Sequence, residues 1–94
     1  MTGEHLDAIL KMAGAKGDKE GWHNLPDGTM TLHVGHGGVG MTISRIDAVR
    51  QDGELVVARN PKRELFVVAR SDIYAVALEG EVGAGKVARR AGFG

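Results

Sequence analysis

The chain has 94 residues, enough for one domain with a modest hydrophobic core. It contains no cysteine, which excludes disulfide bridges, thiolate metal sites and a cysteine nucleophile, and we expect a reducing, cytoplasmic setting. Twelve basic residues balance twelve acidic ones, which excludes the strong positive field of a dedicated nucleic-acid binder. We recognise neither a signal peptide nor a membrane-spanning run, so no membrane partner is expected.

The first predicted element is a short amphipathic helix over residues 2–13. Thr2 can cap it, and the apolar residues recur at helical spacing. Glycines stop the helix, and residues 15–28 then read as a polar connection that contains the only tryptophan and ends in a turn signal, Pro26-Asp27-Gly28.

After Gly28 the apolar residues alternate with a period of two, which indicates strands. The predicted strands cover residues 29–34, 53–60, 63–70 and 72–79. Residues 65–68 are apolar on both faces, which is typical of a strand inside a barrel or beneath a second subunit.

The segment Met41–Gln51 is ambiguous between helix and strand. Its apolar residues fit one side of a helix about as well as a strand with a bulge at Ser44-Arg45. We favour a bent strand, because the segment is rich in β-branched residues, no good cap precedes it, and Asp52-Gly53 is typical of a hairpin turn.

These elements predict a mainly β fold: a short N-terminal helix, then a small five-stranded, strongly bent antiparallel barrel of SH3-like or Sm-like architecture. Residues 1–79 form the single domain, and residues 80–94, rich in glycine and arginine, form a flexible tail. The predicted core consists of Leu6, Ile9, Leu10, Met30, Leu32, Ile43, Leu55, Val57, Leu65, Val67, Val76 and Leu78.

Two glycine motifs suggest nucleotide binding. Gly35, Gly37 and Gly40 have the G-x-G-x-x-G spacing of a dinucleotide site, which requires a helix directly afterwards. Residues 80–87 match a phosphate-binding loop except for Val87, where the motif needs a hydroxyl. We favour a simple glycine loop between two strands for the first motif and a chance match for the second. We therefore expect no cofactor.

The histidines and serines do not predict a metal centre or an enzyme. His33 and His36 could share a metal with His23 or Asp27, but the spacing matches no standard ligand set, so no metal is expected. The serines have no evident histidine and acid partners, and no carboxylate pair is placed for acid–base work.

A set of basic residues could bind a polyanion such as RNA. It comprises Arg45, Arg59, Arg63 and Arg70 on the strands and Lys86, Arg89 and Arg90 in the tail. Residues 60–79, NPKRELFVVARSDIYAVALE, resemble the last hairpin of Sm-like RNA-binding proteins, and ARSDIY resembles the closing strand of the carbon storage regulator family. These resemblances imply a small RNA-binding barrel. The aromatic residues that stack on bases in those families are not recognisable here. We favour the simpler interpretation, in which the arginines pair with nearby acidic residues across strands.

The function that we expect is a non-enzymatic interaction or oligomerisation module. Phe66 and Val68 supply the excess apolar surface behind this expectation, so a second copy of the chain or another protein is the expected partner. RNA binding and dinucleotide binding are the alternatives.

Overall fold

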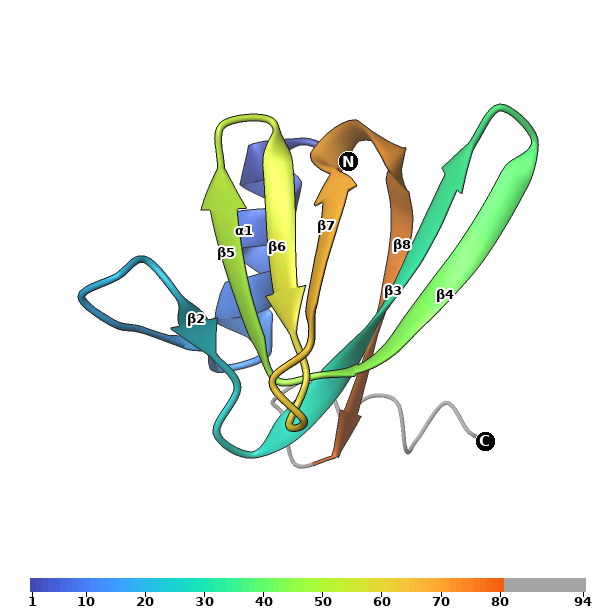
Figure 1. Ribbon diagram of the computed structural model, residues 1–94. Helices are drawn as coiled ribbons and strands as arrows, with labels where there is room; N and C mark the ends of the chain where they lie inside the picture. The colour runs from blue at the N-terminus through green and yellow to red at the C-terminus, as the bar shows by residue number, and fades with distance from the viewer. Residues whose placement is uncertain (81–94) are drawn as a thin grey trace.

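The computed structural model describes residues 1–80 and contains one helix and two antiparallel sheets (Figure 1). The first sheet has the strand order β1-β2-β5-β6-β7, and the second has the order β4-β3-β8. The bounds in chain order are α1 Gly3–Met12, β1 Lys16–Gly17, β2 His23–Asn24, β3 Gly28–His36, β4 Val39–Ile46, β5 Ala48–Asp52, β6 Leu55–Arg59, β7 Leu65–Ala69, the 3-10 turn η1 Arg70–Asp72 and β8 Ile73–Gly80. The mainly β prediction is confirmed. The prediction of a flexible tail lies outside the described residues.

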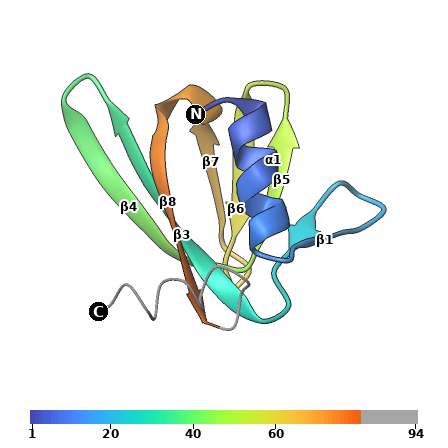
Figure 2. The same ribbon diagram turned by 180° about the vertical axis from the view of Figure 1, so that it is seen from behind.

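Helix α1 begins as the sequence predicts. The hydroxyl of Thr2 accepts a hydrogen bond from the backbone N–H of His5, and Leu6 and Leu10 are buried. The helix covers one face of β5 and β6, as the view from behind shows (Figure 2). The opposite face of the five-stranded sheet points away from the helix, and we call it the outer face.

The two sheets are joined by a sharp bend at Asp47, between β4 and β5. A register shift in the pairing of β3 with β4 leaves Ser44 and Arg45 as a bulge, and Arg45 has a φ of 60°. The predicted strand over Met41–Gln51, with its bulge, is confirmed, and the helical alternative is wrong. Within residues 1–80 no ladder pairs β7 with β4, so a closed barrel is not formed.

The polar connection predicted before Gly28 is partly wrong. Residues 16–24 form a small hairpin, β1–β2, and β2 pairs with β5. This hairpin extends the first sheet and places the only tryptophan, Trp22, on it.

The core lies between α1, the inner face of the first sheet and the second sheet. Leu6, Leu10, Met30, Leu32 and Ile43 are buried there as predicted, while Val76, Leu78 and Ile9 are only half-buried. The core also contains residues that were not predicted to belong to it: Ile46, Val49, Val56, Ala58 and Ile73.

The faces assigned to β6 and β7 are wrong. Leu55, Leu65 and Val67 were predicted to lie in the core, but they are exposed on the other face. Phe66 and Val68, predicted to supply the exposed apolar surface of an interface, instead pack against the core. Both faces of each strand are apolar, so the period of two does not say which face is buried. Pairing of Ala58 with Phe66 puts both on the inner face.

Candidate functional site

Strand pairing arranges the side chains of the outer face in three rows. Residues that are paired across two antiparallel strands have side chains on the same face of the sheet, so each row consists of residues paired in this way. The first row holds Lys16, Asn24, Ala48, Arg59 and Leu65; the second holds Arg50, Val57 and Val67; the third holds Asp52, Leu55 and Ala69.

Trp22 lies on this face and forms a small apolar cluster with Ala48 and Val57, separate from the main core. Its ring is contacted by two guanidinium groups, with the Arg50 and Arg59 Cζ atoms 5.2 Å and 4.9 Å from ring centroids. Cation–π contacts of this kind favour a fixed ring, and only 9% of Trp22 is exposed. Arginines therefore cover the ring, and its faces are not open for a base to stack on.

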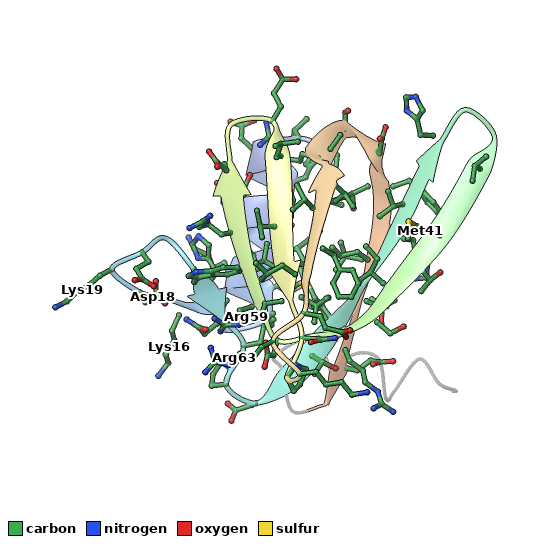
Figure 3. The ribbon with its side chains drawn as sticks, viewed as in Figure 1. Lys16, Asp18, Lys19, Met41, Arg59 and Arg63 are labelled. Atoms are coloured by element: carbon green, nitrogen blue, oxygen red, sulfur yellow. The ribbon has the colours of Figure 1, made fainter. Side chains whose placement is uncertain are left out.

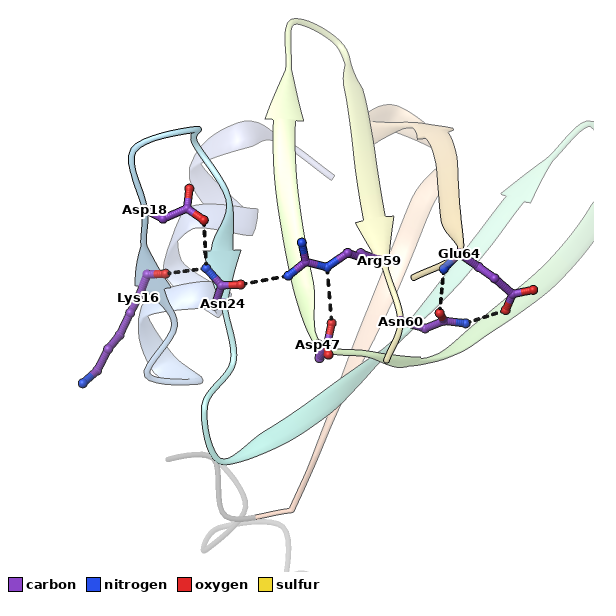
Figure 4. Close-up of polar contacts among 7 residues, drawn as sticks. All are labelled: Lys16, Asp18, Asn24, Asp47, Arg59, Asn60 and Glu64. Atoms are coloured by element: carbon purple, nitrogen blue, oxygen red, sulfur yellow. Dashed lines mark hydrogen bonds and ion pairs between the residues drawn. The ribbon is translucent and has the colours of Figure 1, made fainter. Parts of the chain in front are cut away.

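Asp18 stabilises the β1–β2 hairpin, which contains Trp22, through hydrogen bonds within the hairpin. Its Oδ1 accepts hydrogen bonds from the backbone N–H groups of Glu20 and Trp22, and its Oδ2 accepts one from the Asn24 amide (Figure 4). Desolvation raises the pKa of Asp18, but these hydrogen bonds and the charge of Arg59 outweigh it and hold the pKa below its ordinary value of 3.8.

The lowered pKa of Asp18 predicts acid sensitivity of the hairpin. Ionised Asp18 stabilises the folded hairpin fully above its ordinary pKa of 3.8, and this contribution is lost as the pH falls through the lowered pKa. The NMR shift of the Trp22 indole should follow this loss in the wild type and should not in Asp18→Asn. An unchanged acid transition in Asp18→Asn would contradict this role, and Asp7→Asn serves as the control.

Arg59 is fixed by polar neighbours as well as by Trp22. Its Nη2 donates to Asn24 Oδ1 at 3.1 Å, and its Nε lies 3.9 Å from Asp47 Oδ1 (Figure 4). That Asp47 oxygen is buried and has no hydrogen-bond partner within residues 1–80, so the Arg59 charge is its compensation. Arg50, in contrast, forms no hydrogen bond within the described chain besides the ladder of its strand, so its guanidinium can meet a partner.

Beside the Trp22 cluster, large aliphatic side chains are exposed to solvent. Leu55, Leu65 and Val67 are 46%, 58% and 57% exposed. We call these three residues the apolar strip. The strip lies on β6 and on β7, the edge strand of its sheet, and edge strands offer unpaired backbone groups to partners.

The apolar surface continues around β7 into an open groove of about 340 Å³ between β7 and the β3–β4 hairpin. Val67 and Val68 line one side, and Val39 and Met41 of β4 line the other. Figure 3 places Met41 on the hairpin arm, far from the cluster around Arg59. Val67 thus belongs to both the strip and the groove.

The arginines proposed from the sequence do not form one surface. Arg59 and Arg63 lie near each other and near Lys16 at one end of the first sheet (Figure 3). Arg45 lies on β4 in the other sheet, and Arg70 lies in η1, where its Nη1 donates to Gln51 Oε1 and the Gly53 carbonyl. Lys86, Arg89 and Arg90 lie outside the described residues.

The glycine stretch is a hairpin turn rather than a cofactor loop. Gly37 and Gly38 both have positive φ, as a two-residue turn requires, and Gly35 pairs with Gly40. Strand β4 follows where a dinucleotide site needs a helix, so the geometric condition for that alternative is not met. The favoured interpretation, a glycine loop linking two strands, is confirmed.

The histidines considered as metal ligands lie apart. His36 contacts Asp72 at 3.0 Å, and the ring of His33 lies 6.0 Å from that of Tyr74, while His23 is in β2. Within residues 1–80 no three side chains of the metal-binding types come together to hold an ion.

Comparison with known proteins returned no match to any protein-family model, curated protein or solved structure. In the described part of the chain, no helix has the length and apolar character needed to cross a membrane. The site therefore has to be interpreted from its own chemistry. Trp22 is its central residue, and the sequence signal for it was a lone tryptophan in an otherwise polar segment.

Proposed function

We propose that this protein is a non-enzymatic interaction module that binds another protein surface through the outer face of its five-stranded sheet. The apolar strip next to Trp22 is the observation that supports the proposal most directly. Large aliphatic side chains grouped on an exposed sheet face are typical of interaction sites. Tryptophan and arginine, which flank the strip, are enriched among the residues that dominate binding energy.

The chain order supports a finer proposal for the architecture. We infer an SH3-like or Sm-like barrel that stays open between β7 and β4: β3 lies between β8 and β4, β4 bends at Asp47 into β5, and η1 joins β7 to β8. The absence of cysteine fits a reducing compartment, and we propose the cytoplasm.

RNA binding is the second candidate, favoured by the grouping of Lys16, Arg59 and Arg63 at one end of the sheet (Figure 3). Single-stranded RNA is bound through stacking on open aromatic faces. Here Arg50 and Arg59 cover Trp22, and the surface beside them is aliphatic. A protein partner therefore fits the outer face better than RNA does.

Site-specific photo-crosslinking in cells tests the proposed function. A photoreactive phenylalanine analogue replaces Leu65 on the outer face, and the same analogue at exposed Lys11 of α1 serves as the matched control. Position 65 should form protein adducts that position 11 does not form. RNA adducts at position 65 would favour the second candidate, and equal labelling from both positions would refute the proposed site.

A further inference from the structure

We propose that the partner of the apolar strip is a second copy of this chain, packed face to face about a two-fold axis that runs across the strands. The inference rests on the proposed function and identifies its partner. Its distinguishing contact is Asp52 of each copy against Arg50 and Arg59 of the other.

The outer face has charges of opposite sign at its two ends. Arg59 is at the end where β6 finishes, and the turn that follows carries Arg63 (Figure 3). At the other end Asp52 and Glu54 flank Gly53 in the turn between β5 and β6. Cross-strand pairing of Asp52 with Leu55 keeps this carboxylate beside the apolar strip.

A two-fold axis that runs perpendicular to the strands, level with Val57, places the basic end of one copy over the acidic end of the other. It places the first row of one copy over the third row of the other, and each middle row over itself. Arg50, Val57 and Val67 then each meet their own counterpart at the axis. Two packed sheets lie about 10 Å apart, a separation that side chains from both faces fill.

In this arrangement Asp52 of one copy lies opposite Ala48 of the other. Ala48 is buried in the Trp22 cluster, and the guanidinium groups of Arg50 and Arg59 both contact the ring of Trp22. The carboxylate therefore reaches the surface of the Trp22 cluster, where Arg50 and Arg59 are its nearest cations. Arg59 is already held by Asn24 and Asp47, whereas Arg50 has a free guanidinium within the described residues and supplies the stronger new contact.

The two Arg50 side chains face each other at the axis, because the middle row lies over itself, and the Asp52 carboxylates of the two copies offset this like-charge contact. The other charge near the contact does not oppose it. Arg70 is the cation next to the acidic turn, and its Nη1 is directed to Gln51 and the Gly53 carbonyl, beside the start of α1 and away from the outer face. Because the same patch is used by both copies, the contact closes on itself and gives a dimer rather than a filament.

Charge reversal with rescue tests the proposal on the full chain. Asp52→Arg places like charges opposite each other, and Arg50→Glu does the same from the other side. Each should weaken dimerisation, measured by analytical ultracentrifugation over a concentration series, by about tenfold or more. The double variant should restore the dissociation constant to within about threefold, because the pair is regenerated with exchanged partners.

The matched control is Glu79→Arg, which makes the same change of charge at an exposed position on β8 of the second sheet and should leave dimerisation unchanged. Thermal melts verify that each variant is folded. Equal effects of Asp52→Arg and Glu79→Arg, or no rescue in the folded double variant, would overturn the arrangement. A monomeric wild type that still forms Leu65-dependent adducts with another protein would overturn the second copy as partner and leave the proposed function standing.

Discussion

Replacing Phe66 by aspartate is expected to destabilise the protein strongly. Phe66 lies on the inner face of β7 and packs against the main core. The change removes a large apolar side chain and puts a carboxylate in its place, which together cost about 4 kcal/mol. A domain of this size has roughly 5–15 kcal/mol of stability in total, so a large part of it is lost. Denaturant unfolding followed by circular dichroism measures the effect.

Leu65→Asp is the matched control for that experiment, because it changes the adjacent residue on the opposite face. Leu65 is exposed on β7, so the free energy of unfolding should fall by about 1 kcal/mol or less. The same variant should lose association, because it puts a charge into the apolar strip. Equal destabilisation by Leu65→Asp and Phe66→Asp would contradict the assignment of faces on β7.

Trp22→Ala is expected to produce the second large effect, a loss of about 3 kcal/mol in the free energy of unfolding. The substitution uncovers Ala48 and Val57 and removes the ring that two guanidinium groups contact. It also removes the main apolar anchor of the β1–β2 hairpin on the sheet. Denaturant unfolding by circular dichroism gives the change, since tryptophan fluorescence is lost with the residue.

Trp22→Phe is the control that tests whether the loss in Trp22→Ala comes from the lost aromatic packing or whether any substitution at this position destabilises the protein equally. Phenylalanine keeps an aromatic face for Arg50 and Arg59 and part of the apolar contact, so the loss should be about half of that for alanine. If Trp22→Ala costs less than about 1 kcal/mol, the Trp22 cluster does not organise the outer face, and the hairpin is held by its backbone pairing and Asp18 alone.

Local patterns in the sequence were enough to predict most of the elements. Thr2 as a helix cap, the bulge at Ser44-Arg45 and the Asp52-Gly53 turn were each predicted from signals within a few residues, and all are present. These features depend on backbone conformation that neighbouring residues set. Glycine spacing was also interpreted correctly as a turn, because Gly37 and Gly38 can adopt positive φ.

The candidate site could be predicted only in part. Arg59 and Arg63 were singled out from their charge, but the position of Arg59 in the same row as Lys16 comes from strand pairing across segments distant in sequence. Nothing in the sequence indicated that Trp22 would contact Arg50 and Arg59, because that contact needs the β1–β2 hairpin to join β5. Arg45 and Arg70 were grouped with this set by type alone, and the fold separates them.

The sequence by itself determined that the chain alternates as strands after Gly28, and where most of those strands turn, because side-chain period and turn chemistry are local properties. Only the tertiary structure decided which face of β6 and β7 is buried. In Leu65, Phe66, Val67 and Val68 both faces are apolar, so the hydrophobic effect favours either orientation equally until pairing with β6 fixes one. That choice packs Phe66 against the core and leaves Leu65 and Val67 exposed on the outer face.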